Sequence, residues 1–251
     1  MDKTDTQVLA VWGGPSCGKT VVGAKIAKYI SSLKKNVALV LCDTDAPPLP
    51  LLLPPSELET EKSLGSILAA ARISENLILQ NSITVKKQPY ISIIGMLKGE
   101  NCYSYPRYTD RQALNLIDNL KKIADYIVID CSSHISDNIL STIALTKSDC
   151  VLRIINCDLK SISYLSSQLT LLADKKFKTD KQIKIANNVK SIHSGENIEQ
   201  ILGGLAFTIP NCIGVEQQYL AGELLKDLPF NKETKEFRKT IQSICEEVFD
   251  L

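Results

Sequence analysis

Eight consecutive residues near the amino end combine glycines, a lysine and a hydroxyl side chain at a spacing that could do chemistry. They are Gly13, Gly14, Pro15, Ser16, Cys17, Gly18, Lys19 and Thr20, and they follow the pattern G-x-x-x-x-G-K-[S/T]. The glycines let the backbone wrap closely around an anion, and free N–H groups of a following helix point at it. Lys19 could reach the β- and γ-phosphates of a nucleotide, and the Thr20 hydroxyl could ligate Mg²⁺. The pattern therefore predicts binding of a nucleoside triphosphate.

The segments on either side of this loop have the character that such chemistry requires. Val8–Trp12 is an apolar run of buried-strand length, and Val22, Ile26, Ile30 and Leu33 recur at helical spacing. A strand, a glycine-rich turn and a helix are therefore expected in that order.

An acidic residue ends a second apolar run, Tyr126–Ile129. If this strand lies beside the loop, Asp130 would hold Mg²⁺, directly or through water. Cys131-Ser132-Ser133 then follows where a loop sensing the γ-phosphate would lie. The alternative is an aspartate that only caps a turn or a helix.

Two more carboxylates, Asp43 and Asp45, follow the strand Val37–Cys42. One could orient or activate the attacking water, and the other could support Mg²⁺ through its hydration shell. The alternative is a pair of turn-forming aspartates before Pro47. Ligands of parallel α/β folds bind beyond the carboxyl ends of the strands, which favours the functional interpretation.

Apolar and amphipathic segments alternate along the whole chain, which predicts an α/β fold in one domain spanning residues 1–251. We expect a doubly wound, mostly parallel, twisted sheet of about seven strands with helices on both faces. The expected strands are Val8–Trp12, Val37–Cys42, Tyr90–Ile94, Tyr126–Ile129, Val151–Asn156, Ile183–Asn187 and Leu205–Ile209. Helical patterns occupy residues 19–34, 57–71, 110–124, 136–146, 160–173, 196–203 and 232–249. Ser56 and Glu59 form a capping box that predicts a helix start near Glu57.

The ordered motifs resemble the ParA/MinD family of P-loop ATPases, the deviant-Walker-A group. The motifs are Gly13–Thr20, Asp43-Thr44-Asp45, residues 124–130, Ala144-Leu145 with Ser148-Asp149, Asn156-Cys157-Asp158, residues 185–189 and residues 206–210. The resemblance implies the family's twisted parallel sheet, ATP as the nucleotide and Mg²⁺ as its ion. It also implies roles for single residues. Asp45, with Asp43 and Lys19, supports hydrolysis, and Asp158 is an acid near the ribose and the dimer seam. The nucleotide pocket includes Pro210 and Asn187, and Asn187 reads adenine.

One departure from the family pattern concerns the signature lysine, which reaches across the dimer and belongs at Gly14 in this sequence. Pro15 and Ser16 also replace glycines of the family. A cation supplied in trans to phosphates accelerates other P-loop enzymes by ~10³–10⁵. Its loss predicts slow hydrolysis, or a substitute cation such as Lys98, Arg107 or Arg153. Lysine-less variants of this kind occur among TadZ-like proteins of pilus assembly and ParA-like proteins of mobile elements.

Composition narrows the choice of partners. The formal net charge is +1, so no global basic field indicates nucleic acid, and no apolar stretch approaches the length that spans a bilayer. The eight cysteines form no C-x-x-C pair, which suits a reducing cytoplasm. A lysine-rich segment leaves DNA binding open, although a solvated loop is the favoured interpretation; its lysines are Lys175, Lys176, Lys178, Lys181 and Lys184.

Residues 46–55 hold five prolines and four leucines, so no helix is expected there. We interpret the segment as an apolar arm that docks on a second subunit or protein partner; a loop packed on the chain itself is the alternative. The last helix places Phe237, Ile241, Ile244 and Val248 on one face, which predicts docking on the sheet rather than on a membrane.

These observations favour a cytoplasmic, weakly hydrolysing ATPase that dimerises across its nucleotides and positions or partitions a cargo such as DNA or a pilus, secretion or conjugation complex. Two alternatives remain open. One is an ATP-bound scaffold with negligible turnover, suggested by Gly14. The other is a small-molecule, ATP-dependent enzyme of the same superfamily.

Overall fold

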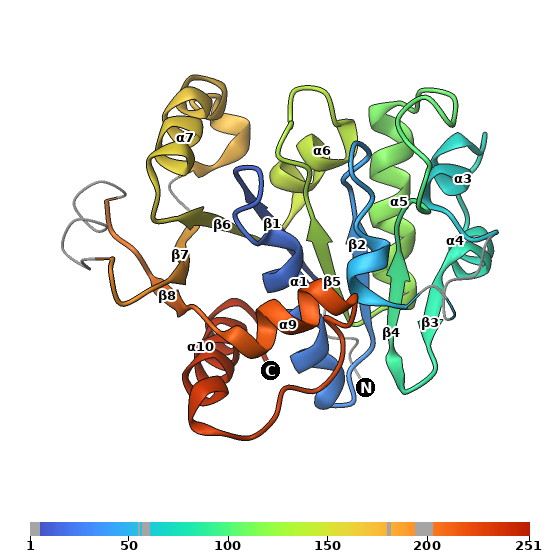
Figure 1. The fold of residues 1–251 in the computed structure, drawn as a ribbon. Coiled ribbons are helices and arrows are strands. Elements are labelled where there is room, and N and C mark those ends of the chain that lie inside the picture. The colour runs from blue at the N-terminus through green and yellow to red at the C-terminus, as the bar shows by residue number, and fades with distance from the viewer. Residues whose placement is uncertain (1–5, 55, 57–60, 180–181, 194–202) are drawn as a thin grey trace.

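The computed structural model describes residues 6–54, 56, 61–179, 182–193 and 203–251. Its centre is an eight-stranded sheet in the order β3-β4-β2-β5-β1-β6-β7-β8 (Figure 1). All neighbouring pairs are parallel except β3 with β4. The strands are β1 (Gln7–Gly13), β2 (Val37–Leu41), β3 (Ile83–Val85), β4 (Gln88–Ile94), β5 (Tyr126–Asp130), β6 (Cys150–Asn156), β7 (Ile183–Val189) and β8 (Phe207–Pro210).

The central strands are mostly apolar, which suits a sheet that is covered by helices on both faces. Leu9 and Val11 of β1 pack on one face, whereas Val8, Ala10 and Trp12 pack on the other. Val11 lies beside Asp130 of β5 in the register of the sheet. The glycine-rich loop after β1 and the acid that ends β5 are therefore neighbours, as their sequence positions predicted.

Two helical layers enclose this sheet. One core is formed with α1 (Lys19–Ser32), α2 (Leu49–Leu52), α9 (Ile213–Ala221) and α10 (Lys232–Val248). The opposite core is formed with α3 (Leu64–Ala69), α4 (Glu75–Asn81), α5 (Asp110–Ile123), α6 (Ile139–Lys147) and one end of α7 (Leu159–Leu172). Figure 1 shows α1, α9 and α10 in the lower half and α5, α6 and α7 in the upper half. The predicted docking of the last helix is confirmed, since Phe237, Ile241 and Ile244 are buried.

The seven predicted strands are all present, within two residues of their predicted bounds. The expected number of strands was too low, because β3 forms an antiparallel hairpin with β4 at the sheet edge. Three residues are too few to give a periodic signal. The exposed Lys86 and Lys87 of the hairpin place charge at this edge, which discourages pairing with another chain.

Several helical expectations need correction. Helices α4 and α9 are short and were not predicted. The helix expected over 57–71 is represented by α3, which begins at Leu64 with Ser63 as its N-cap. The predicted start at Glu57 and its capping partner Glu59 lie outside the described residues, as does the helix predicted over 196–203 apart from its last residue.

The proline- and leucine-rich segment does contain a helix, the single turn α2. Pro50 is tolerated because it lies in the first turn, where its missing N–H would have no helical partner. Leu49, Leu52 and Leu53 are buried in the core shared with α1. The segment thus packs its leucines on the chain itself, which matches the alternative rather than the apolar arm.

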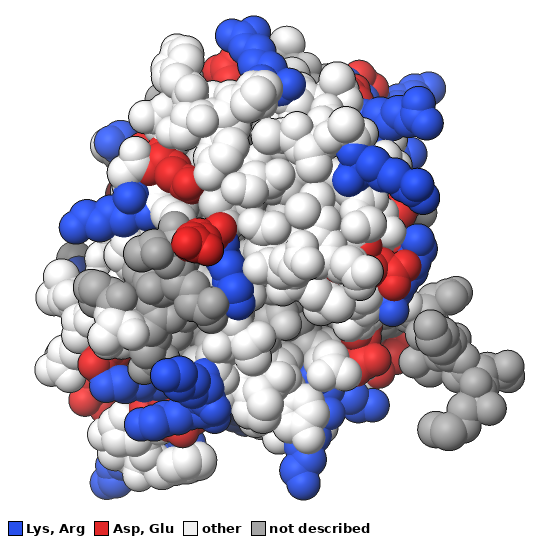
Figure 2. Space-filling view, turned by 90° about the vertical axis from the view of Figure 1, so that its right-hand side faces the viewer, with Lys and Arg blue, Asp and Glu red and all other residues white. Residues whose placement is uncertain are grey.

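Charges are mixed on the surface that the structure describes. Figure 2, which views the right-hand side of Figure 1, shows acidic and basic side chains interspersed around a central uncharged area. In the lysine-rich segment, Lys176 pairs with Asp174 at 3.2 Å and lies over the ring of Phe177. Lys181 lies outside the described residues. No helix in the described ranges is long and apolar enough to cross a membrane.

Candidate functional site

The loop between β1 and α1 has the backbone form of an anion cradle. Ser16 and Gly18 both adopt positive φ, 57° and 89°. Gly18 is the N-cap of α1, and no side chain caps the first turn of that helix. The first amides of α1 are therefore left for a ligand, and the positive end of the helix dipole favours an anion there. A side chain at Gly18 would also collide with the Asn187 amide.

Lys19 is buried and points along the loop rather than into solvent. Its Nζ donates to the Gly14 carbonyl oxygen at 3.0 Å and to Ser133 Oγ at 2.6 Å. The ammonium group is thereby held between the loop and the segment after β5. Ser133 therefore lies against the loop, and the expected sensing of the γ-phosphate by Cys131-Ser132-Ser133 stays a prediction.

Thr20 and Asp130 meet below the loop, 110 residues apart in sequence. Thr20 Oγ1 donates to Asp130 Oδ2 at 2.5 Å, and Asp130 is 2% exposed. Burial raises the pKa of Asp130 to about 6, although Lys19 and the Thr20 hydroxyl act to lower it. Asp130 Oδ1 is buried and has no hydrogen-bond partner among the described residues.

These oxygens form a donor set that suits Mg²⁺. Mg²⁺ prefers oxygen ligands and keeps several waters, so one hydroxyl and one carboxylate suffice when phosphate oxygens complete the shell. A hydrated cation would also satisfy the orphaned Oδ1, which otherwise carries an uncompensated desolvation cost. Thr20 and Asp130 would hold the ion, which would neutralise phosphate charge.

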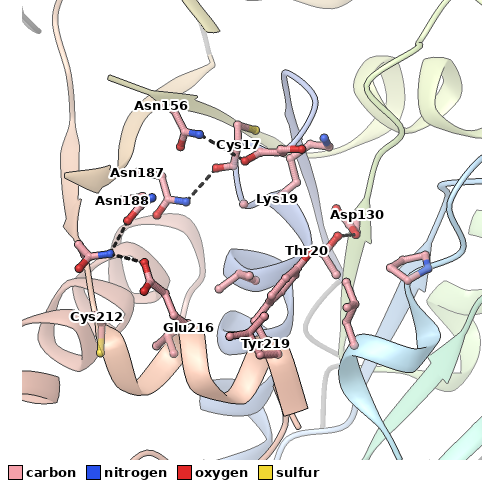
Figure 3. A pocket seen from close by; sticks show the side chains of 18 of the residues that line it. Cys17, Lys19, Thr20, Asp130, Asn156, Asn187, Asn188, Cys212, Glu216 and Tyr219 are labelled. Carbon is pink, nitrogen blue, oxygen red and sulfur yellow. Dashed lines mark hydrogen bonds between the residues drawn. The ribbon is translucent and has the colours of Figure 1, made fainter. Parts of the chain in front are cut away.

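A cavity of about 610 Å³ extends from the loop toward α9 (Figure 3). Its loop end is lined by Ser16, Cys17, Gly18, Lys19, Thr20 and Asp130. Its far end is lined by Asn187, Asn188, Pro210, Asn211, Val215 and Glu216. The cavity is large enough for a small-molecule ligand.

Comparison with known proteins rests on structure, because no family model and no curated protein matches the sequence. A ParA family ATPase from Chlorobium tepidum superposes with a TM-score of 0.79 at 18% identity, over 95% of this chain and 98% of that one. MinD from Pyrococcus horikoshii, complexed with Mg-ADP, gives 0.72 at 19% identity, over 95% and 96%. A putative plasmid partition protein from Borrelia burgdorferi, bound to AMPPNP, gives 0.72 at 16% identity, over 97% and 100%.

The chain has the ParA/MinD fold. The remaining residues that the resemblance singled out can now be placed within that fold. Asn187 Nδ2 donates to the Cys17 carbonyl oxygen at 2.8 Å, so this side chain fastens the loop to the end of β7. Its role in reading adenine stays a prediction, as does the role of Pro210, which lines the cavity beside it.

Asp43 and Asp45 share no hydrogen bond with the Thr20–Asp130 pair, although the charge of Asp43 acts to raise the pKa of Asp130. Asp43 lines the cavity, but its Oδ1 accepts hydrogen bonds from the backbone N–H groups of Asp45 and Ala46, at 3.0 and 2.9 Å. These bonds describe a turn, which the alternative interpretation anticipated. Asp45 is exposed and does not line the cavity. The catalytic roles of both residues stay predictions.

Asp158 is exposed and caps α7, since its Oδ1 accepts from the Ser161 N–H at 2.8 Å. It does not line the cavity. Arg153, one of the substitute cations, is buried on β6 and donates to Gln182 Oε1 through Nε at 2.9 Å. Lys98 and Arg107 are exposed and also lie outside the cavity lining. None of these four side chains lines the cavity, and their roles stay predictions.

Gly14 occupies the position where the ParA/MinD pattern places its signature lysine. A Cβ atom at this position would lie 3.1 Å from Cδ1 of the Tyr164 ring. Tyr164 also donates its hydroxyl hydrogen to the Ser133 carbonyl oxygen and packs against Trp12, with ring centroids 6.2 Å apart. Burial raises the pKa of Tyr164 to about 12, so it stays a donor. Where the family pattern has a lysine, this chain thus has a glycine that the Tyr164 ring packs against.

Tyr164, Asn211 and Glu216 were not predicted as site residues from the sequence, whereas Asn188 lies in the recognised motif at residues 185–189. Tyr164 sits in a helix with no motif around it. Asn188 directly follows Asn187 and Asn211 directly follows Pro210, whereas Glu216 lies in α9, six residues after Pro210. The signal that could have found Asn211 is its place directly after β8, where ligands of parallel α/β folds bind.

Proposed function

We propose that this chain is an ATP-binding switch that hydrolyses ATP slowly and forms a dimer across its bound nucleotides. The observation that carries the proposal is the Lys19, Thr20 and Asp130 arrangement beneath an uncapped helix N-terminus, within a ParA/MinD fold. In this proposal the loop from Gly13 to Thr20 binds the phosphates. Thr20 and Asp130 hold Mg²⁺, and Asn187 lies beside the adenine base of the nucleotide.

The output of such a switch is positional: partitioning of DNA, or placement of a pilus, secretion or conjugation complex. Support comes from the structural likeness to ParA, MinD and plasmid partition proteins. The exposed stretch at Asp45 and Ala46, next to the cavity, is where a protein partner could sense the nucleotide. The cysteines in the described residues are all free, which supports a cytoplasmic location.

The first experiment is calorimetric titration with ATP and Mg²⁺. Wild-type protein is expected to bind, and Lys19→Ala is expected to lose at least tenfold in affinity because the ammonium group that faces the phosphates is gone. Lys35→Ala removes an exposed lysine just after α1 and serves as the matched control. Equal heats for wild type and Lys19→Ala would overturn nucleotide binding at this loop.

The second experiment measures molecular size by light scattering with ADP and with a non-hydrolysable ATP analogue. The proposal expects a dimer with the analogue and a monomer with ADP. A monomer under both conditions would overturn the dimer switch while leaving nucleotide binding intact.

A second candidate function is an ATP-bound scaffold with negligible turnover. It is favoured by Gly14, by the Tyr164 ring that covers this position, and by the exposed location of Asp45. Phosphate release from ATP and Mg²⁺ separates the two candidates. Measurable turnover that Asp45→Ala abolishes would exclude the scaffold, whereas tight binding without turnover would exclude the hydrolysing switch.

A further inference from the structure

The two residues that hold the Lys19 ammonium group are both in contact with one side chain, Tyr164 of α7. Lys19 Nζ donates to the Gly14 carbonyl oxygen at 3.0 Å and to Ser133 Oγ at 2.6 Å. The Tyr164 ring packs against Gly14, and the Tyr164 hydroxyl donates to the Ser133 carbonyl oxygen. Helix α7 lies beside the loop that follows β1 (Figure 1). A helix outside every recognised motif therefore supports both anchors of the lysine.

The Tyr164 ring is itself held in place by a row of side chains. It packs against Trp12, with ring centroids 6.2 Å apart and ring planes inclined by 47°. Trp12 is fully buried, and the Arg153 guanidinium lies over it, 6.0 Å from the ring centroid. Gln182 Oε1 accepts from Arg153 Nε at 2.9 Å, which fixes the guanidinium in turn. This backing gives Tyr164 the rigidity that a residue needs in order to position another.

The hydroxyl and the ring of Tyr164 act on different anchors, so they can be tested separately. The hydroxyl bonds the Ser133 carbonyl oxygen, whereas the ring lies on Gly14. The Ser133 carbonyl oxygen also accepts from the Ile135 N–H at 3.1 Å. It therefore keeps a partner when the hydroxyl is removed, and Tyr164→Phe avoids the cost of an unsatisfied buried group.

We propose that Tyr164 is a positioning residue of the phosphate site, whose hydroxyl holds Ser133 against Lys19 while its ring supports Gly14. The inference rests on the proposed nucleotide binding and names the residue that aims the lysine. Loop amides also hold the β-phosphate, whereas the γ-phosphate lies further out, where Lys19 and the segment after β5 contact it. The Tyr164 hydroxyl therefore contributes to binding of ATP and not to binding of ADP.

The test compares the dissociation constants of ATP and ADP, each with Mg²⁺, by calorimetry. In Tyr164→Phe the affinity for ATP is expected to fall roughly 2- to 10-fold, the net contribution of one neutral hydrogen bond, while the affinity for ADP stays within about twofold. A tyrosine that only fills space would leave the ratio of the two constants unchanged. A rise in ATP affinity would also overturn the proposal, because the Ser133–Lys19 contact would then compete with the nucleotide.

A double-mutant cycle tests whether the hydroxyl acts through Ser133. Ser133→Ala removes one acceptor of the Lys19 ammonium group and is expected to change the ratio of the ATP and ADP constants in the same direction as Tyr164→Phe. Adding Tyr164→Phe to Ser133→Ala is expected to have no further effect, because groups in one hydrogen-bond network are not additive. Additive effects would overturn an action of Tyr164 through Ser133.

Two controls accompany these measurements. Tyr103→Phe makes the same chemical change at a side chain that is 88% exposed, and it is expected to leave the ratio unchanged. Trp12 is the only tryptophan in the chain, and it contacts the Tyr164 ring. Its fluorescence emission maximum is expected to be equal in wild type and Tyr164→Phe, which verifies that the ring keeps its place.

Failure of this inference differs from failure of the proposed function. If both nucleotides bind in a Lys19-dependent way but their ratio is the same in wild type and Tyr164→Phe, positioning by Tyr164 is overturned and the proposed function stands. If neither nucleotide binds wild-type protein, both the proposed function and this inference are overturned.

Discussion

Two strand ends carry acids that the sequence marked in the same way, yet the structure uses them differently. Asp130 ends β5 with 2% of its surface exposed, and its partner Thr20 comes from a helix 110 residues away. Asp43 follows β2 and accepts hydrogen bonds from the backbone of Asp45 and Ala46, within its own turn. Asp45 itself is exposed.

The difference shows that the environment of an aspartate at a strand end depends on the segments that cover it. The end of β5 lies beside β1, so the loop and the first turn of α1 cover Asp130 and remove it from water. In the part of the chain that the structure describes, no such cover lies over the turn after β2, where Asp43 is half-buried and Asp45 is exposed. Burial leaves Asp130 Oδ1 without a hydrogen-bond partner among the described residues, whereas Asp43 Oδ1 accepts two backbone hydrogen bonds.

The largest expected effect is on metal-dependent binding in Asp130→Asn. Loss of the carboxylate should weaken Mg²⁺-dependent ATP binding by roughly 10- to 100-fold. Calorimetry with ATP, in Mg²⁺ and in EDTA, measures this effect. Asp43→Asn is the matched control at the other strand end. An equal loss of affinity in both variants would contradict a special role of Asp130 in Mg²⁺-dependent binding.

The same substitution is expected to stabilise the nucleotide-free protein at high pH. The pKa of Asp130 is raised in the folded state to about 6, so its protonated form stabilises the fold below pH ~4, and this stabilisation is lost as the pH rises through 6. A shift of this size corresponds to about 3 kcal/mol. Urea unfolding should show that the free energy of unfolding of Asp130→Asn exceeds that of wild type by more at pH 8 than at pH 5. A gain that is equal at both pH values would contradict a buried, ionised carboxylate.

A side chain at position 14 tests how tightly the phosphate loop after β1 packs against Tyr164. Gly14→Lys is expected to destabilise the protein by about 1–3 kcal/mol, because even its Cβ would press on the Tyr164 ring. Combining it with Tyr164→Ala should recover part of the loss in a double-mutant cycle of urea unfolding. Additive effects would mean that Tyr164 does not constrain position 14.

The exposed strand end should respond less. Asp43→Ala removes two turn hydrogen bonds and is expected to cost about 1 kcal/mol in thermal or urea unfolding. Asp43→Asn keeps an acceptor oxygen and should lose less than the alanine variant. A loss above that of Gly14→Lys would show that this turn supports more of the fold than its contacts suggest.

The smallest effect on stability is expected for Asp45→Ala, within about 0.5 kcal/mol of wild type, because its side chain is exposed. Any change in ATP turnover by this variant would therefore report on chemistry rather than on folding. A large loss of stability would contradict the exposed position of the Asp45 side chain.

Sequence patterns predicted the parts of this molecule whose signal is contiguous. The phosphate loop, the apolar strands and the strand-ending Asp130 each occupy one short stretch, so spacing and periodicity were sufficient. The hairpin strand β3 and helices α4 and α9 were missed because they are too short to show a period. The leucines of residues 49–53 were assigned outward because apolar character does not tell which surface they meet.

The sequence alone determined that a strand, a glycine-rich turn and a lysine-bearing helix would form, since each depends on local backbone preferences and side-chain period. Only the tertiary structure decided that Asp130 loses its water while Asp45 keeps it, and that Tyr164 stands over Gly14. It alone joined Asn188, Asn211 and Glu216 at one end of the cavity. Burial and distance depend on segments far apart in the chain, and strand order in the sheet brings those segments together.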